Sequence, residues 1–242
     1  MEGAIVAGVG AIEGVGGAAS RRFAREGLHV FVAGRTPEKI EAVAQRIEAD
    51  GGTATPVPTD CTVPGDVTAL FDRVEAETGS PPRLVLYNAG NNFPKDFLEL
   101  TPEEFEGSWR VCGLGAFLAG QEAARRMPAN GGGTLLFTGA TASVRSRPPF
   151  VAFASAKAAE RAVAHGLARQ FGPQGLHVAH LIIDGVILGE QIKSRFPAAV
   201  DRLGEDGMLS PDGIADAMWM LHRQPPTTWT LELDLRPYKE TF

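Results

Sequence analysis

The sequence predicts an α/β fold built on a doubly wound parallel sheet, and three observations lead to that prediction. Short apolar runs alternate with amphipathic helical patterns along the whole 242-residue chain. The apolar runs are continuous, which is typical of strands buried on both faces. A glycine cluster joins the first run to the first helical pattern, as in α/β nucleotide-binding units. We therefore expect about seven strands, with helices on both faces of the sheet.

In the first third of the chain the predicted elements alternate strand and helix, over residues 4–9, 15–26, 28–34, 36–50, 53–57, 66–78 and 83–87. Gly27 closes the first helical pattern. Thr36 and Pro37 supply the N-cap and first-turn residues of the next helix, which stops at Gly51 and Gly52. These signals give the order β-α-β-α-β-α-β.

The alternation continues to the C-terminus with predicted elements over residues 101–127, 134–138, 150–171, 177–183, a helix after 210–211 and a strand near 230–235. Thr101 and Glu104 form a capping-box pattern at the start of the long helix. Three glycines at residues 131–133 separate this helix from the next strand. No linker or internal repeat divides the chain, so we expect one dinucleotide-binding domain over residues 1–242.

Composition favours a small-molecule partner. With 23 basic and 29 acidic residues the net charge is -6, which offers no basic surface for nucleic acid or an anionic membrane. No apolar run approaches the ~20 residues that a membrane-spanning helix needs, so we expect a soluble, cytoplasmic protein. Two cysteines, Cys61 and Cys112, are too few for a disulfide framework, so we expect both to be reduced. No histidine has the spacing of a metal ligand, so we predict no metal site.

The glycine cluster GVGAIEGVG, residues 8–16, indicates a nucleotide site. Gly10, Gly14 and Gly16 would form the tight turn, let a pyrophosphate approach the backbone and let the helix that begins near Val15 pack closely. A glycine-rich turn alone is a weak signal, and a purely structural loop is the alternative. Its position after the first strand of an α/β chain favours the nucleotide site.

The end of the second strand bears on which dinucleotide is bound. A carboxylate about 20 residues after the glycines suits the ribose hydroxyls of NAD, whereas an arginine suits the 2′-phosphate of NADP. This chain has Arg35 there, which favours NADP(H) over NAD(H). Glu13 in the glycine loop argues against that preference if it faces the same phosphate.

These motifs together resemble the short-chain dehydrogenase/reductase family, over essentially the whole chain. The three glycines match the family's TGxxxGxG with Val9 in place of threonine. Asp60 matches the aspartate that meets the adenine ring, and Asn88, Ala89 and Gly90 match the NAG that follows the fourth strand. The resemblance implies a Rossmann-like fold, a nicotinamide dinucleotide cofactor and a homodimer or homotetramer.

The resemblance also implies a catalytic tetrad of Asn, Ser, Tyr and Lys, of which this chain keeps only the lysine. Lys157 would hold the nicotinamide ribose, but Phe153 stands four residues earlier, in the tyrosine position, and carries no proton. Cys112 takes the place of the asparagine. The resemblance therefore implies a divergent member with an atypical catalytic site.

The serine position is also altered. Counting back about 13 residues from Phe153 gives Ala140, so Thr141 is the first candidate for the hydroxyl and Ser143 the second. Hydroxyl groups that merely cap the strand end are the alternative. The remaining proton sources are a water held by Lys157 or Lys157 itself; neither Tyr87 nor Tyr238 is an evident replacement.

After the sixth strand the family usually has Pro-Gly, and here the chain has Asp184 and Gly185. Backbone groups of Val186 or Ile187 would hold the nicotinamide carboxamide. Asp184 is either a carboxylate near the nicotinamide or a turn residue, and the turn is favoured. The segment of residues 189–206 is a candidate mobile lid over the substrate, with three notable side chains, Lys193, Arg195 and Phe196.

Two functions remain open from the sequence. The first is an NADP(H)-dependent oxidoreductase with a modified proton-transfer site, acting on a small carbonyl, alcohol or activated alkene. The second is a catalytically inactive nucleotide-binding or structural homologue. A positioned general acid contributes ~10²–10⁴ in rate, so loss of the tyrosine weakens such an enzyme without removing hydride transfer.

Overall fold

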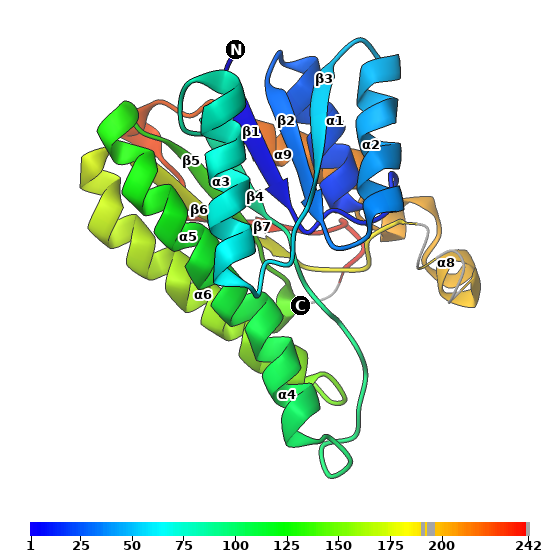
Figure 1. Cartoon of the computed structure of the whole chain (residues 1–242). Helices are drawn as coiled ribbons and strands as arrows, with labels where there is room; N and C mark the ends of the chain where they lie inside the picture. Colours follow the sequence, from blue (N-terminus) through cyan, green and yellow to red (C-terminus); the bar gives the residue numbers. More distant parts are fainter. Residues whose placement is uncertain (190–191, 193–196, 241–242) are drawn as a thin grey trace.

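A computed structural model describes residues 1–189, 192 and 197–240. Its centre is a sheet of seven parallel strands in the order β3-β2-β1-β4-β5-β6-β7 (Figure 1). The strands are β1 (Gly3–Ala7), β2 (His29–Gly34), β3 (Thr53–Pro58), β4 (Leu84–Tyr87), β5 (Gly133–Thr138), β6 (Leu176–Ile183) and β7 (Glu232–Leu235). The order reverses between β1 and β4, which makes their carboxyl ends the expected place for a ligand. The predicted doubly wound, Rossmann-like sheet is confirmed.

Helices cover both faces of the sheet. They are α1 (Val15–Arg25), α2 (Pro37–Ala49), α3 (Pro64–Thr78), α4 (Pro102–Trp109), the π-helix η1 (Arg110–Leu114), α5 (Gly115–Arg126), α6 (Val151–Phe171), α8 (Pro197–Leu203) and α9 (Pro211–His222). Helices α1, α2 and α9 pack on one face, and α3, α5 and α6 pack on the other (Figure 1). Among the described residues no helix is both long and apolar enough to span a bilayer.

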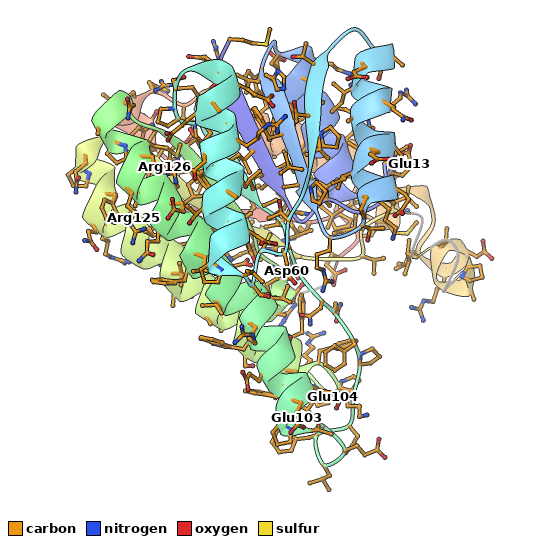
Figure 2. All side chains as sticks on the ribbon, viewed as in Figure 1. Glu13, Asp60, Glu103, Glu104, Arg125 and Arg126 are labelled. Atoms are coloured by element: carbon orange, nitrogen blue, oxygen red, sulfur yellow. The ribbon has the colours of Figure 1, made fainter. Side chains whose placement is uncertain are left out.

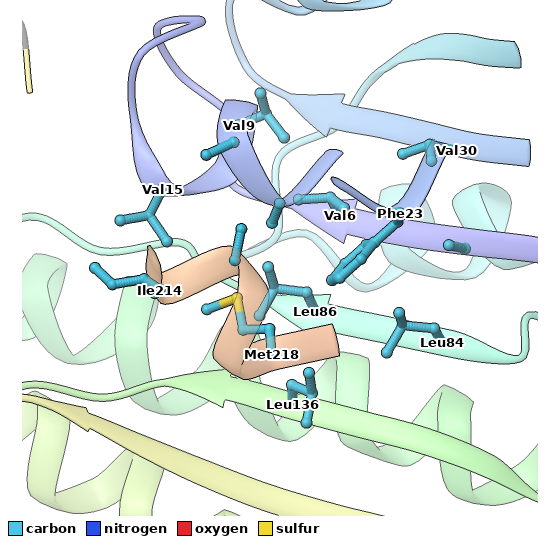
Figure 3. Close-up of a cluster of buried hydrophobic side chains, with 14 of the residues drawn as sticks. Val6, Val9, Val15, Phe23, Val30, Leu84, Leu86, Leu136, Ile214 and Met218 are labelled. Carbon is cyan, nitrogen blue, oxygen red and sulfur yellow. The ribbon is translucent and has the colours of Figure 1, made fainter. Parts of the chain in front are cut away.

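The continuous apolar strands are explained by these two layers. Successive side chains of a strand point to opposite faces, so Ala4 and Val6 of β1 join the core under α1 and α9, while Ile5 and Ala7 join the core under α3 and α5. Figure 3 shows the first of these cores, where Phe23 of α1 lies among strand residues and α9. Both faces of the central strands are therefore buried.

The long helix expected over residues 101–127 contains a π-helical turn. Its start is as predicted, since Thr101 Oγ1 accepts a hydrogen bond from the Glu104 amide at 3.2 Å and Glu104 Oε2 accepts one from the Thr101 amide at 3.0 Å. Residues Arg110–Leu114 then form the π-helix η1, which separates α4 from α5. The buried Tyr87 donates its hydroxyl proton to the Val111 carbonyl in that turn. A hydrogen bond from a distant strand thus accompanies the π-helical turn. The helical pattern in the sequence does not predict this turn.

The candidate lid segment contains the short helix α8 (Pro197–Leu203) within the range expected to be a mobile loop. Lys193, Arg195 and Phe196 lie outside the described residues. Isolated β-bridge pairing joins Ile187 to Leu209, so the two ends of this segment are tied together beside the carboxyl end of β6.

Candidate active site

The glycine turn between β1 and α1 fits a pyrophosphate. Gly14 is the N-cap of α1, no side chain in the described part of the chain caps this helix, and its first turn has no acidic residue. The first-turn amides are consequently available to an anion at the positive end of the helix dipole. A Cβ added to Gly16 would lie 3.2 Å from Val9 Cα, so glycine allows the close packing of α1 on β1 that the sequence predicted. Arg21 donates a hydrogen bond to the Ile12 carbonyl and braces the loop.

Arg35 and Asp60 follow the carboxyl ends of β2 and β3. Arg35 is exposed directly after β2, and Asp60 precedes α3 (Figure 2). Asp60 Oδ1 accepts hydrogen bonds from the Thr62 amide at 2.9 Å and the Thr62 hydroxyl at 2.8 Å. These bonds, the amide first, lower the pKa of Asp60, and the positive charge of Arg35 acts in the same direction. Asp60 therefore has a local structural role besides the adenine contact that the resemblance implies, and Glu13 is exposed in the glycine loop.

The Asn88–Gly90 loop contacts both the glycine turn and helix α6. Asn88 Nδ2 donates to the Gly8 carbonyl at 3.0 Å. Gly8 has φ +86°, and a Cβ there would lie 2.4 Å from the Ala89 amide nitrogen, so only glycine fits this approach of β1 and the loop. A Cβ added to Gly90 would lie 3.7 Å from Lys157 Nζ and 3.9 Å from Phe153 Cε2. The loop thus lies directly over the lysine and the phenyl ring.

Lys157 is buried at the carboxyl end of β5, with 3% of its surface exposed. Its Nζ donates to the Thr138 carbonyl at 2.7 Å and lies 5.8 Å from the centroid of the Phe153 ring. The ring therefore makes a cation–π contact with the ammonium of Lys157. The structure brings Lys157 and Phe153 together as the helical spacing predicted.

Glu160 is a site residue that the sequence analysis missed. Its carboxylate accepts from Lys157 Nζ at 2.9 and 3.1 Å, and its side chain is wholly buried. Burial raises the pKa of Glu160 to about 7, although the ammonium of Lys157 opposes the shift. A charged residue three positions after the lysine, on the same buried helix face, was the signal that would have identified it.

Cys112 occupies the π-turn beside the lysine helix and is fully buried. Its thiol lies 4.0 Å from Asn91 Oδ1, which also accepts a hydrogen bond from the Ser108 hydroxyl at 3.2 Å. Burial raises the pKa of Cys112, which disfavours the thiolate. Asn91, next to the NAG loop, is a second polar residue of the site that the sequence analysis did not identify.

Thr141 and Asp184 form a hydrogen-bonded pair. Thr141 Oγ1 donates to Asp184 Oδ1 at 2.6 Å, across the carboxyl ends of the neighbouring strands β5 and β6. The Asp184 side chain is buried, and guanidinium nitrogens of Arg145 and Arg236 lie 3.5 and 3.8 Å from its two oxygens. The Asp184 amide donates to the Leu235 carbonyl at 2.8 Å, Gly185 follows at φ +147°, and the Asp184 carboxylate contacts the candidate hydroxyl.

The hydroxyl of Ser143, the second candidate, bonds to a neighbouring backbone amide. It is buried, and its Oγ accepts a hydrogen bond from the Ala140 amide at 3.1 Å. This is the capping role that the sequence left open as an alternative. Thr141 is thus the better placed of the two hydroxyl groups.

After β6, the backbone amide and carbonyl of Ile187 are better candidates for a ligand contact than those of Val186. The Val186 carbonyl accepts from the Leu209 amide, and the Leu188 amide donates to the Leu209 carbonyl, both at 2.8 Å. In this parallel bridge the amide and carbonyl of Ile187 point away from Leu209. Ile187 is therefore the better candidate for a carboxamide contact.

The chain has two tyrosines, Tyr87 and Tyr238. Tyr87 is buried with its hydroxyl on the Val111 carbonyl, and burial raises the pKa of Tyr87 well above its usual value. Tyr238 is 80% exposed near the C-terminus. The Tyr87 hydroxyl is therefore already engaged, and Tyr238 is open to solvent.

Comparison with known proteins gives consistent matches. The family model for short chain dehydrogenases matches residues 4–194. The uncharacterized oxidoreductase YuxG of Bacillus subtilis is 36% identical over 186 residues, which are 76% of this chain but only 27% of YuxG. The chloroplastic NADPH-dependent aldehyde reductase-like protein of Arabidopsis thaliana is 25% identical over 228 residues, 89% of this chain and 84% of that protein. A crystal structure of a short-chain dehydrogenase from Rhodopseudomonas palustris is 36% identical and aligns with a TM-score of 0.81 over 97% of this chain and 99% of its own.

Proposed function

This chain belongs to the short-chain dehydrogenase/reductase family, and we propose that it is an NADP(H)-dependent oxidoreductase with a modified proton-transfer site. Its substrate would be a small carbonyl, alcohol or activated alkene. The observation that carries the proposal is the position of Lys157, whose ammonium lies beneath the Asn88–Gly90 loop at the carboxyl end of β5. The family resemblance assigns the nicotinamide ribose to that position. When bound, the dinucleotide supplies or accepts the hydride.

Two features support NADP(H) in particular. The N-terminus of α1 suits the pyrophosphate of either dinucleotide, but Arg35 is exposed where the 2′-phosphate of NADP would lie. A guanidinium can hold a phosphate with two parallel hydrogen bonds. The Arabidopsis relative is named as NADPH-dependent, which agrees with this preference.

Thr141 and Asp184 are the residues that we assign to proton transfer. Because the Thr141 proton points to Asp184, the Thr141 oxygen is able to accept a hydrogen bond from a substrate hydroxyl. As hydride leaves the carbon of an alcohol, the hydroxyl proton would pass to Thr141 while the proton of Thr141 passes to Asp184. Carbonyl reduction would use the same transfers in reverse.

A catalytically inactive nucleotide-binding homologue is the second candidate, and one observation favours it. All three hydrogen-bond donors of the Lys157 ammonium have protein acceptors within reach, two on Glu160 and one on Thr138. Such a lysine offers little to a ribose hydroxyl. Turnover of NADPH with a simple carbonyl, aldehyde or enone would exclude this candidate.

We also propose a cytoplasmic homodimer or homotetramer that binds a small molecule. Phe105, Trp109 and Phe117 are 40%, 43% and 47% exposed on α4 and α5. The family resemblance implies pairing through the long helices of this part of the chain. A second copy of the chain would cover these side chains.

Fluorescence titration with NADPH and NADH tests the cofactor assignment. Wild type should bind NADPH at least about tenfold more tightly than NADH. Arg35→Leu should weaken NADPH binding by about 10–100-fold, the range for hydrogen bonds to charged groups, and change NADH binding little. Arg25→Leu, an exposed arginine in the last turn of α1, is the matched control and should change neither. Absence of binding for both nucleotides would refute the proposed function.

A further inference from the structure

Glu160 is a buried carboxyl beside the proposed ribose-binding lysine, and the proposed function gives it no role. It lies on the same face of α6 as Lys157, has no exposed surface, and has both oxygens within 3.1 Å of Lys157 Nζ. An isolated buried carboxylate is costly, and among the described residues Lys157 supplies the positive charge that compensates it. Buried ionisable side chains often mark functional sites, so Glu160 is a candidate for a role in cofactor binding.

The hydrogen-bond donors of Lys157 limit what this residue can hold. An ammonium has three N–H donors, and three protein oxygens surround it: Thr138 O at 2.7 Å, and the two oxygens of Glu160 at 2.9 and 3.1 Å. With Glu160 ionised, all three donors have partners and the pair is electrically neutral. With Glu160 protonated, only one carboxyl oxygen remains a good acceptor, so one donor and a net positive charge become available.

We propose that Glu160 is a positioning residue whose protonation releases Lys157 to hold the nicotinamide ribose, so that cofactor binding takes up a proton at this carboxyl. This inference rests on the proposed function, because it assumes that a dinucleotide binds beside Lys157. It adds a regulatory property of that site: affinity for the cofactor falls as pH rises.

The neighbouring titratable groups leave Glu160 as the group that changes charge near neutral pH. On η1, burial raises the pKa of Cys112, and on β4, burial raises the pKa of Tyr87 well above its usual value. On β6, burial lowers the pKa of His180 to about 4, although Glu232 opposes the shift. All three are therefore neutral between pH 6 and 8, whereas burial raises the pKa of Glu160 to about 7.

Calorimetric titration with NADPH tests the inference in the wild type and in Glu160→Gln. Wild-type affinity should fall by about tenfold between pH 6 and 8.5, the low end of the contribution from one hydrogen bond to a charged group. Glutamine has a single oxygen acceptor and no charge, so it mimics the protonated carboxyl. Glu160→Gln should match wild type at pH 6 and lose this fall, apart from the titration of the 2′-phosphate, which is common to all variants.

Glu122→Gln is the matched control. Glu122 is also a buried glutamate on a helix, but it pairs with Arg125 and Arg126 of α5 (Figure 2 labels both arginines) and does not contact Lys157. This variant should keep the wild-type pH profile. If Glu160→Gln fails to fold, wild type alone still gives the answer: titrations in two buffers of different ionisation enthalpy should show uptake of about half a proton near pH 7.5.

The outcomes separate the inference from the proposed function. NADPH binding with the same pH profile in wild type and Glu160→Gln, or with no proton uptake by wild type, would overturn the inference and leave the proposed function standing. Absence of NADPH and NADH binding to wild type at every pH would overturn both. Loss of the pH profile in Glu160→Gln alone would support both.

Discussion

Replacing Glu160 with glutamine should change how protein stability depends on pH. Burial raises the pKa of Glu160 from 4.5 to about 7, so the folded state holds this proton more tightly than the unfolded chain. A raised carboxyl pKa contributes stability that is fully present below pH 4.5 and is lost as pH rises to about 7. The full effect is on the order of 3 kcal/mol, and most of it falls between pH 5 and 8.

Urea unfolding of both proteins at pH 5 and pH 8, at one protein concentration, measures this effect. Other titrating groups are shared and cancel in the difference between the two free energies of unfolding. Relative to wild type, Glu160→Gln should gain about 2 to 3 kcal/mol in free energy of unfolding from pH 5 to pH 8, whatever constant cost the substitution carries. A difference that does not depend on pH would refute the idea that Glu160 takes up a proton in the folded protein near neutrality.

Two further predictions concern the proton-transfer site. Asp184→Asn and Thr141→Val should each lower turnover by about 10²–10⁴-fold and change NADPH affinity little, because the pair would move the proton and not hold the nucleotide. A loss of NADPH affinity as large as the loss of turnover would contradict this assignment. Phe153→Tyr should raise carbonyl reduction if the tyrosine geometry of the family persists above Lys157, and an unchanged rate with intact NADPH binding would show that the site no longer works in that way.

The sequence predicted the fold closely because its signals are local. Apolar runs, the capping pair Thr101 and Glu104, and the glycine stops locate strands and helices to within about three residues. The π-turn at Arg110–Leu114 was not predicted, because it is associated with Tyr87, a residue of a distant strand. Helix α8 was also missed, since a seven-residue helix has too little periodicity to stand out.

The site was predicted in part. Gly14, Arg35 and Lys157 follow from motif spacing, because the carboxyl ends of parallel strands meet at one edge of the sheet. The pairing of Thr141 with Asp184 depends on the register of β5 against β6 and on how the following turns lie, which no spacing rule supplies. Glu160 was within reach of the i, i+3 rule but was overlooked, since the family resemblance directs attention to the positions before the lysine.

A crystal structure of the NADPH complex would test the central claim most directly. The account predicts the 2′-phosphate on Arg35, a nicotinamide ribose hydroxyl within hydrogen-bond distance of Lys157 Nζ, and Thr141 Oγ1 facing the nicotinamide C4 region. A nucleotide bound away from Lys157, or a C4 region with no proton donor or acceptor within reach, would contradict it.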